Sequence, residues 1–129
     1  MHQNLNKGIS GELTTQVTRE NTAEAYKSGL IAVFATPAMI ALVENTAQLS
    51  IQPYLEEGYT TVGTEVNIKH IKATPVGMQV RAKSELLEVQ GNKLKFAVEA
   101  HDETGKIGFG THTRYIIHTA TFLQNLQNK

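Results

Sequence analysis

The chain has 129 residues, of which 40% are hydrophobic, 6% aromatic and 19% charged. This length suits a single domain, and the apolar content is enough for a core, which excludes intrinsic disorder as the main state. The 12 Lys and Arg residues balance 12 Asp and Glu, so no net charge attracts nucleic acid or an anionic membrane surface. The absence of cysteine excludes disulfides, thiolate catalysis and cysteine-ligated zinc.

No segment is typical of a secretory signal or a membrane span. Residues 1–7 are polar and lack the apolar core of a signal peptide. The longest apolar stretch, residues 29–34, is far shorter than the ~20 residues that a membrane span needs. We therefore expect a cytoplasmic protein with no nucleic-acid or membrane partner. We expect one domain over residues 1–129, with its core at 11–118 and loosely held ends that include residues 124–129.

The clearest local element is a helix that begins near Thr36 and Pro37. Threonine is a good N-cap, and proline is favoured in the first turn because its missing N–H needs no partner there. Apolar residues then recur at spacings of three and four, until Pro53 and Gly58 end the pattern. These residues are Met39, Ile40, Val43, Ala47 and Ile51. The pattern predicts a mostly buried helix of about four turns.

Elsewhere the hydrophobic period is two, which is typical of strands with one wet face and one apolar face. Strands are expected at residues 11–18, 60–70, 78–86, 93–101 and 107–117, with a turn or two of helix at 22–28. Turn sequences separate the last four strands. They are Thr74-Pro75-Val76-Gly77, Gln90-Gly91-Asn92 and Asp102-Glu103-Thr104-Gly105. The last four strands are expected to form an antiparallel meander. The pattern predicts an α+β fold, in which an antiparallel sheet of about five strands wraps around one long central helix.

In the last strand, the alternation predicts which side chains face the helix. The apolar set is Ile107, Phe109, Tyr115 and Ile117, and the opposite set is Gly108, Gly110, His112 and Arg114. We therefore expect His112 and His101 to be solvated and His118 to lie at a strand end, and these histidines form no convincing metal set. Arg114 is either a surface cation or a group near a site. Strand glycines indicate close approach of another backbone or of a ligand, and Gly63 belongs to this class as well.

A single helix covers only part of a five-stranded sheet, and the edge strands stay open. Joining two sheets edge to edge would cover one such edge in each copy. The architecture therefore favours a homodimer.

Three reactive side chains lie on apolar faces or at the helix start. Glu44 lies within the apolar helix, where a carboxylate either reaches solvent or is held as a base or nucleophile. His70 has the parity of Val62 and Ile68, so it is either a satisfied core histidine or an acid–base group. Thr36 is either a plain N-cap or a hydroxyl beside free N–H groups, which suit a developing oxyanion or a thioester carbonyl.

The spacing of Thr36 and Glu44 links the site to the dimer. At 1.5 Å per helical residue the two lie ~12 Å apart along the helix axis, so they cannot share a hydrogen bond within one chain. If both act on one substrate atom, a second subunit must bring them together.

Several of these segments together resemble a known family. They are the run from Phe34 to Glu44 (FATPAMIALVE), Thr60-Thr61-Val62-Gly63-Thr64, Ile68-Lys69-His70 and Ala73-Thr74-Pro75-Val76-Gly77. This combination resembles the fluoroacetyl-CoA thioesterase-like family of hot-dog-fold proteins, over roughly residues 11–118. The resemblance implies a dimer with sites at its interface, acyl-CoA substrates, and no cofactor apart from the CoA of the substrate. It implies a catalytic set of Thr36, Glu44 and His70 and substrate-binding roles for Gly63, Arg114 and Phe34.

The expected reaction is hydrolysis of a small acyl-CoA thioester. Glu44 acts as the nucleophile or activates water, while Thr36 and His70 orient groups and transfer protons. Three alternatives stay open: a non-catalytic acyl-CoA binding or sensing module, a hot-dog dehydratase, and a purely structural dimer.

Overall fold

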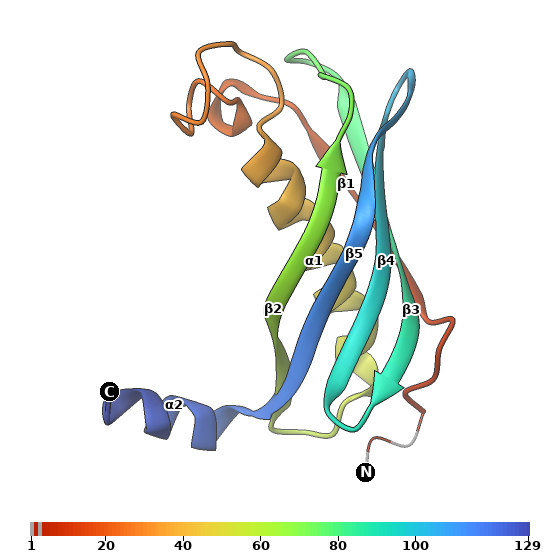
Figure 1. Ribbon diagram of the computed structural model, residues 1–129, viewed down its shortest axis with the longest axis vertical. Helices are drawn as coiled ribbons and strands as arrows, with labels where there is room; N and C mark the ends of the chain where they lie inside the picture. The colour runs from red at the N-terminus through yellow and green to blue at the C-terminus, as the bar shows by residue number, and fades with distance from the viewer. Residues whose placement is uncertain (1, 3) are drawn as a thin grey trace.

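One long helix lies across a five-stranded antiparallel sheet in the computed structural model (Figure 1), which describes residue 2 and residues 4–129. The elements are β1 (Ser10–Gln16), the short 3-10 helix η1 (Arg19–Asn21), α1 (Thr36–Ile51), η2 (Gln52–Tyr54), β2 (Tyr59–His70), β3 (Gln79–Gln90), β4 (Lys93–Asp102), β5 (Gly105–His118) and α2 (Thr119–Gln127). The strand order is β1-β3-β4-β5-β2. The predicted α+β architecture is confirmed.

Strands β3, β4 and β5 form the predicted meander, but β2 does not precede them in the sheet. It pairs with β5 and is left as an edge strand, as β1 is at the opposite edge. The connection from β2 to β3 is tied to the segment before α1. The Phe34 N–H donates to the Thr74 carbonyl, and Val33 bridges to Pro75. These bonds hold the chain as it passes from one side of the sheet to the other.

The core between α1 and the sheet consists of two clusters. In one, Val43 and Ile51 of the helix pack against buried residues of β3, β4 and β5. In the other, Phe34 and Met39 pack against Val80 and neighbouring residues. Removing these apolar surfaces from water stabilises the domain by about 25 cal/mol for each Å² buried.

Two glycines of β5 allow other parts of the chain to come close to this strand. A Cβ on Gly108 would lie 2.6 Å from the sulfur of Met39, and one on Gly110 would overlap the Asn67 carbonyl of β2. Only glycine fits such contacts. The predicted close approach at these two positions is confirmed.

The predicted inward face of β5 is wrong over most of the strand. Phe109 and Tyr115 are 41% and 40% exposed, whereas His112 and Arg114 are buried. A register irregularity in the β4–β5 pairing near His101 shifts the alternation, so that Ile107 and the glycine-containing face are both buried. The inward polar groups are tolerated because they bond to one another and to β2.

Two helical predictions also fail. Residues 22–28 form turns rather than helix, with Lys27 in the left-handed region at φ 58°, and only η1 precedes them. Residues 124–127, predicted to be loosely held, belong to α2. Leu123 and Leu126 of α2 follow a spacing of three, and both are about half exposed, so this helix forms without a core to pack against.

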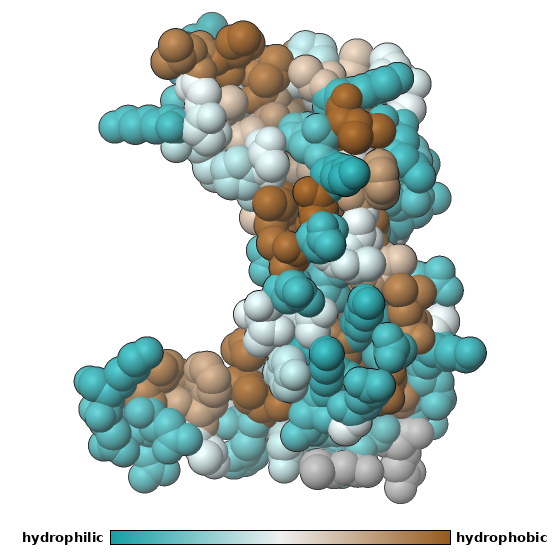
Figure 2. All heavy atoms as spheres, in the orientation of Figure 1, coloured by the Kyte–Doolittle hydropathy of each residue, from teal (hydrophilic) through white to brown (hydrophobic). Residues whose placement is uncertain are grey.

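The segment before α1 and helix α2 project from the two ends of the molecule on the side of β2 (Figure 1). Between these projections the surface is hollowed, and brown apolar side chains appear on both of them and on the wall between (Figure 2). Among the described residues, no helix is long and apolar enough to span a bilayer.

Candidate active site

The hydroxyl of Thr36 forms one half of a side-chain pair with His70. Thr36 is the first residue of α1, and the N-cap is Ala35, which makes no side-chain cap. The predicted N-cap role of Thr36 is therefore wrong. Its Oγ1 lies 2.8 Å from Nδ1 of His70 instead, because β2 ends beside the first turn of the helix. This pair, Thr36 and His70, is called the hydroxyl–imidazole pair below.

The environment of His70 keeps its ring neutral at pH 7. Burial lowers the pKa of His70 below its ordinary 6.5, and a backbone hydrogen bond with Lys72 offsets part of this effect. The Nε2 atom is buried and has no hydrogen-bond partner among the described residues. A neutral imidazole with one unpartnered nitrogen is able to accept or deliver a proton.

A surface hollow of ≈ 290 Å³ lies directly beside the hydroxyl–imidazole pair. Its lining includes Phe34, Thr36, His70 and Lys72. The side chain of Phe34 is only 1% exposed and belongs mainly to the core. The hollow is small, and the hydroxyl–imidazole pair forms part of its lining.

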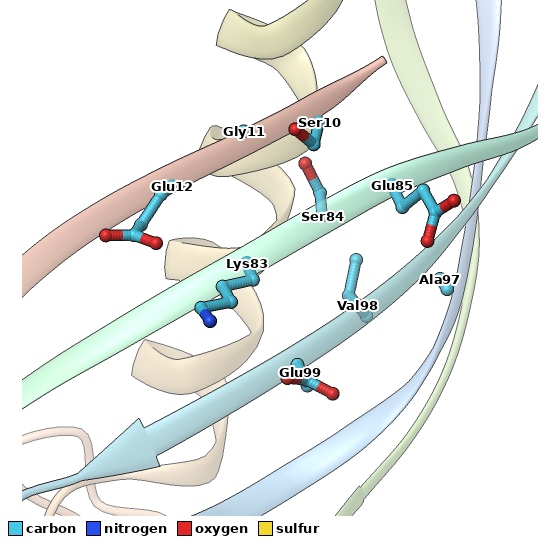
Figure 3. Close-up of a pocket in the computed structure, with 9 residues that line it drawn as sticks. All are labelled: Ser10, Gly11, Glu12, Lys83, Ser84, Glu85, Ala97, Val98 and Glu99. Carbon is cyan, nitrogen blue, oxygen red and sulfur yellow. The ribbon is translucent and has the colours of Figure 1, made fainter. Parts of the chain in front are cut away.

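A larger hollow of ≈ 490 Å³ lies over β1, β3 and β4 (Figure 3). Its lining carries the charged side chains of Glu12, Lys83, Glu85 and Glu99, and it contains none of the predicted site residues. It offers no pairing of a hydroxyl with an imidazole. Of these two hollows, the smaller one brings a hydroxyl and an imidazole together.

Glu44 of α1 faces the guanidinium of Arg114, a residue of β5 that lies opposite Gly63 of β2. The side chain of Glu44 is 37% exposed, and its Oε2 lies 3.9 Å from Nη1 of Arg114. The carboxylate therefore reaches solvent and also lies beside a cation, while its role as a base or nucleophile stays a prediction. The pairing fixes its direction without removing it from water.

The guanidinium of Arg114 is buried and held on three sides. Its Nε–H donates to Oγ1 of Thr61 at 2.7 Å, its Nη2 to the Thr61 carbonyl at 3.1 Å, and its Nη1 to Nε2 of His112 at 3.1 Å. Arg114 is 8% exposed, so the surface-cation alternative is wrong. Thr61 in turn donates to the side chain of Gln48 on α1, which ties this arrangement to the helix.

Gly63 makes room for this group on the β2 side. It lies opposite Arg114 at a register irregularity in the β2–β5 pairing. A Cβ at this position would be 2.9 Å from Oε2 of Glu44 and 3.2 Å from Nη1 of Arg114. The glycine therefore lets the β2 backbone approach the ion pair. The four residues Glu44, Gly63, His112 and Arg114 are called the carboxylate–guanidinium cluster below.

His112 is the site residue that sequence reasoning missed. The alternation of the last strand predicts a solvated His112, yet the residue is 1% exposed and contacts Arg114 directly. The sequence does hold one signal for it, because His112 lies on the same face of the strand as Gly108, Gly110 and Arg114. Polar residues and glycines that alternate along one strand mark a face that meets other backbone, and this face turns inward here.

One chain holds these two groups apart. Thr36 and Glu44 belong to the same helix and are ~12 Å apart along its axis. The hydroxyl–imidazole pair lies at the end of β2, and the carboxylate–guanidinium cluster lies near its middle. Among residue 2 and residues 4–129, no group of three or more His, Cys, Asp or Glu side chains could hold a metal ion.

Residues 17–120 match the profile of the family described as fluoroacetyl-CoA-specific thioesterase. The chain belongs to this family. A fluoroacetyl-CoA thioesterase from Streptantibioticus cattleyicolor is 40% identical over 97 residues, which are 75% of this chain and 70% of the relative. The predicted family and the predicted class of enzyme, a thioester hydrolase, are confirmed.

Solved structures superpose on nearly the whole chain. The fluoroacetyl-CoA thioesterase FlK is 32% identical with a TM-score of 0.92, covering 98% of each chain. A variant of FlK in complex with fluoroacetate and CoA is 33% identical with a TM-score of 0.86, covering 92% of this chain and 99% of that one. A hot-dog-like protein from Thermanaerovibrio acidaminovorans, at 18% identity, has a TM-score of 0.88 and covers 96% and 92%. The hot-dog fold is thereby confirmed.

Proposed function

We propose that this chain hydrolyses small acyl-CoA thioesters at a site completed in a homodimer, with Thr36, Glu44 and His70 as the catalytic set. The observation that carries the proposal is the Thr36–His70 hydrogen bond of 2.8 Å beside a small hollow. Family membership supports the reaction class, and the FlK variant solved with fluoroacetate and CoA supports CoA as the carrier. We propose no cofactor beyond that CoA.

The start of α1 supplies groups that polarise a thioester carbonyl. The first turn has no side-chain cap, so the N–H groups of Thr36 and Ala38 lack intrahelical partners, while Pro37 has none to offer. Unpaired N–H groups and the positive end of the helix dipole stabilise negative charge on the carbonyl oxygen as it develops. The hydroxyl of Thr36 lies at the same place and is fixed there by His70.

The carboxylate of Glu44 supplies the base or the nucleophile. As a base it takes a proton from water, whose oxygen attacks the thioester carbon. As a nucleophile it attacks directly, and water then cleaves the resulting anhydride. In both routes the carbon–sulfur bond breaks, a proton reaches the CoA sulfur, and the products are a free acid and CoA. His70, neutral at pH 7 because burial lowers its pKa, is placed to transfer that proton.

In a homodimer, the hydroxyl–imidazole pair of one copy can lie close to the carboxylate–guanidinium cluster of the other copy. β2 is an edge strand, and pairing it with β2 of a second copy would run the two strands antiparallel around a two-fold axis. Within one strand Gly63 and His70 are ~23 Å apart. If the axis crosses β2 midway between these two positions, near residues 66 and 67, the partner copy's position 63 lies at the level of His70 along the strands. The partner's carboxylate–guanidinium cluster thereby moves toward the hydroxyl–imidazole pair.

Apolar surface on the side of β2 supports the same dimer. Leu30 and Ile31 are 92% and 69% exposed, Val66 of β2 is 42% exposed, and Leu123 and Leu126 of α2 are 54% and 50% exposed. The two projections that carry most of them flank the hollowed face (Figure 2). An extensive exposed apolar surface of this kind marks an interaction site.

Substrate size follows from the lining of the smaller hollow. Its volume of ≈ 290 Å³ and the buried ring of Phe34 in its lining favour a short acyl group over a long chain. We propose Gly63 and Arg114 as further acyl contacts, because Gly63 leaves open the space where a Cβ would meet Glu44 and Arg114.

The test is release of free thiol from a panel of acyl-CoAs, from acetyl through medium-chain to aromatic, read with a disulfide dye. The protein contains no cysteine, so it adds no background. Release from the short members, lost in Glu44→Gln, supports the thioesterase. Binding of acyl-CoA without release would favour a binding or sensing module, and neither binding nor release would contradict the proposal.

A further inference from the structure

His112 makes contacts that only a neutral imidazole in one tautomer can make. Nδ1 lies 2.8 Å from the carbonyl of Glu65 on β2, and Nε2 lies 3.1 Å from Nη1 of Arg114. A carbonyl accepts and a guanidinium donates, so Nδ1 carries the proton and Nε2 presents its lone pair. Both nitrogens are satisfied, although the ring is 1% exposed.

The other partners of the ring fix its plane. Phe96 of β4 stacks against it, with the ring centroids 6.3 Å apart and the planes at 28°. Its Cε1 lies 3.2 Å from the place where a Cβ of Gly63 would be. The imidazole is therefore held by β2, β4 and β5 together and cannot turn without displacing one of them.

His112 and Thr61 together fix the direction of the Arg114 guanidinium. Thr61 holds the Nε and Nη2 side of the guanidinium, and His112 holds Nη1. Nη1 is also the nitrogen that faces Oε2 of Glu44 at 3.9 Å. Without an acceptor at Nε2, nothing on β5 would keep this nitrogen directed at the carboxylate.

We propose that His112 is a positioning residue, which orients the Arg114 guanidinium and through it the Glu44 carboxylate for thioester hydrolysis. The inference rests on the proposed function, in which Glu44 acts on the thioester or on water. His112 itself touches neither in this account. Its role is to present the Nε2 lone pair to Nη1 of Arg114. Another side chain that places an acceptor at the same point should therefore perform this role.

Three substitutions separate this role from simple packing. His112→Gln keeps an acceptor near the Nε2 position, His112→Asn keeps only a donor near the Nδ1 position, and His112→Leu keeps neither. We expect His112→Gln to retain kcat within about threefold, whereas Asn and Leu lower kcat about tenfold or more with KM less affected. His101→Gln, the same change at a histidine of β4 that contacts Glu99, is the matched control and should behave as the wild type.

A second measurement needs no substrate. The ¹H–¹⁵N signal of the Arg114 Nε–H reports how firmly the guanidinium is held. It should exchange slowly with solvent in the wild type and in His112→Gln, and faster in His112→Leu. If the wild type releases no thiol from any acyl-CoA, the proposed function fails, and this signal alone decides whether His112 positions Arg114.

Two results would overturn the inference. One is a wild-type kcat in folded His112→Leu, together with an unchanged Arg114 signal. The other is a loss in His112→Gln as large as that in His112→Leu, because the ring would then matter for its shape rather than for its acceptor. Far-ultraviolet circular dichroism on each variant establishes that the compared proteins are folded.

Discussion

Oγ1 of Thr36 lies 2.8 Å from Nδ1 of His70, although the two residues are 34 positions apart in the chain. The contact joins the first turn of α1 to the last residue of β2, and so it places a hydroxyl and a neutral imidazole at the start of a helix. Most threonines at this point in a sequence would cap the helix. Here Ala35 is the N-cap, and the Thr36 hydroxyl pairs with His70 instead of capping the helix.

Removing this hydroxyl should affect activity far more than stability. Thr36 is exposed and makes no cap, so Thr36→Ala should change the free energy of unfolding by less than about 1 kcal/mol. Its kcat should fall on the order of a hundredfold, as measured by thiol release. Thr36→Ser, which keeps the hydroxyl, should retain most of the activity. Equal activity in the two variants would remove the hydroxyl from the mechanism.

Gly63 should tolerate no side chain. In Gly63→Ala the new Cβ would stand 2.9 Å from Oε2 of Glu44 and 3.2 Å from Nη1 of Arg114, so the ion pair must move. We expect loss of most thiol release and a destabilisation of roughly 1–3 kcal/mol in urea unfolding. Gly29→Ala is the control, since its Cβ would meet only Ala23 at an ordinary 3.4 Å. Similar results for both glycines would contradict the crowding that we describe at Gly63.

Arg114→Lys should be destabilising although it conserves the charge. Lysine cannot supply the three nitrogens that bond to Thr61 and His112, so buried acceptors lose their donors. The expected loss is roughly 1–3 kcal/mol, measured by chemical denaturation. A variant as stable as the wild type would mean that these hydrogen bonds contribute little to the folded state.

Stability should decrease as the solution becomes acidic below about pH 6.5. Burial lowers the pKa values of His70 and His112 in the folded protein below their ordinary 6.5, so the unfolded chain binds more protons in this range. The free energy of unfolding therefore rises with pH up to the unfolded value and is then constant with respect to these groups. Urea unfolding at pH 5.5, 7.5 and 8.5 tests this.

The paired variant His70→Gln, His112→Gln should show a smaller loss between pH 7.5 and 5.5 than the wild type. The interval from pH 7.5 to 8.5 is the internal control, because neither histidine titrates there. An unchanged loss in the paired variant would assign the acid sensitivity to other groups.

The elements that sequence reasoning located were those with a strong local pattern. The helix with Thr36-Pro37 at its start and apolar spacing to Ile51, and the five alternating strands, are within a few residues of their observed bounds. Such elements are predicted by the spacing of hydrophobic residues within the segment itself. The position of β2 beside β5 could not be obtained in this way, since pairing between distant strands leaves no local signal.

Thr36, Glu44 and His70 remain a predicted catalytic set, and the sequence did not predict how the residues around Glu44 support one another. The alternation with Phe109 and Tyr115 predicts an outward His112 and leaves Arg114 as either a surface cation or a group near the site. In the folded chain these aromatics are on the exposed face, and the polar pair is buried by its bonds to Thr61 and to the Glu65 carbonyl. Hydrogen-bond satisfaction across strands decided the face, and it depends on tertiary structure.

The most direct test of the central claim is to mix two inactive variants, Thr36→Ala and Glu44→Gln, after unfolding and refolding them together. If Thr36 and His70 of one copy act with Glu44 of the other, each mixed dimer regains one intact site. Random pairing then restores about a quarter of the wild-type thiol release. Activity no greater than that of the separate variants, in mixtures shown to contain mixed dimers, would contradict a site shared between two copies.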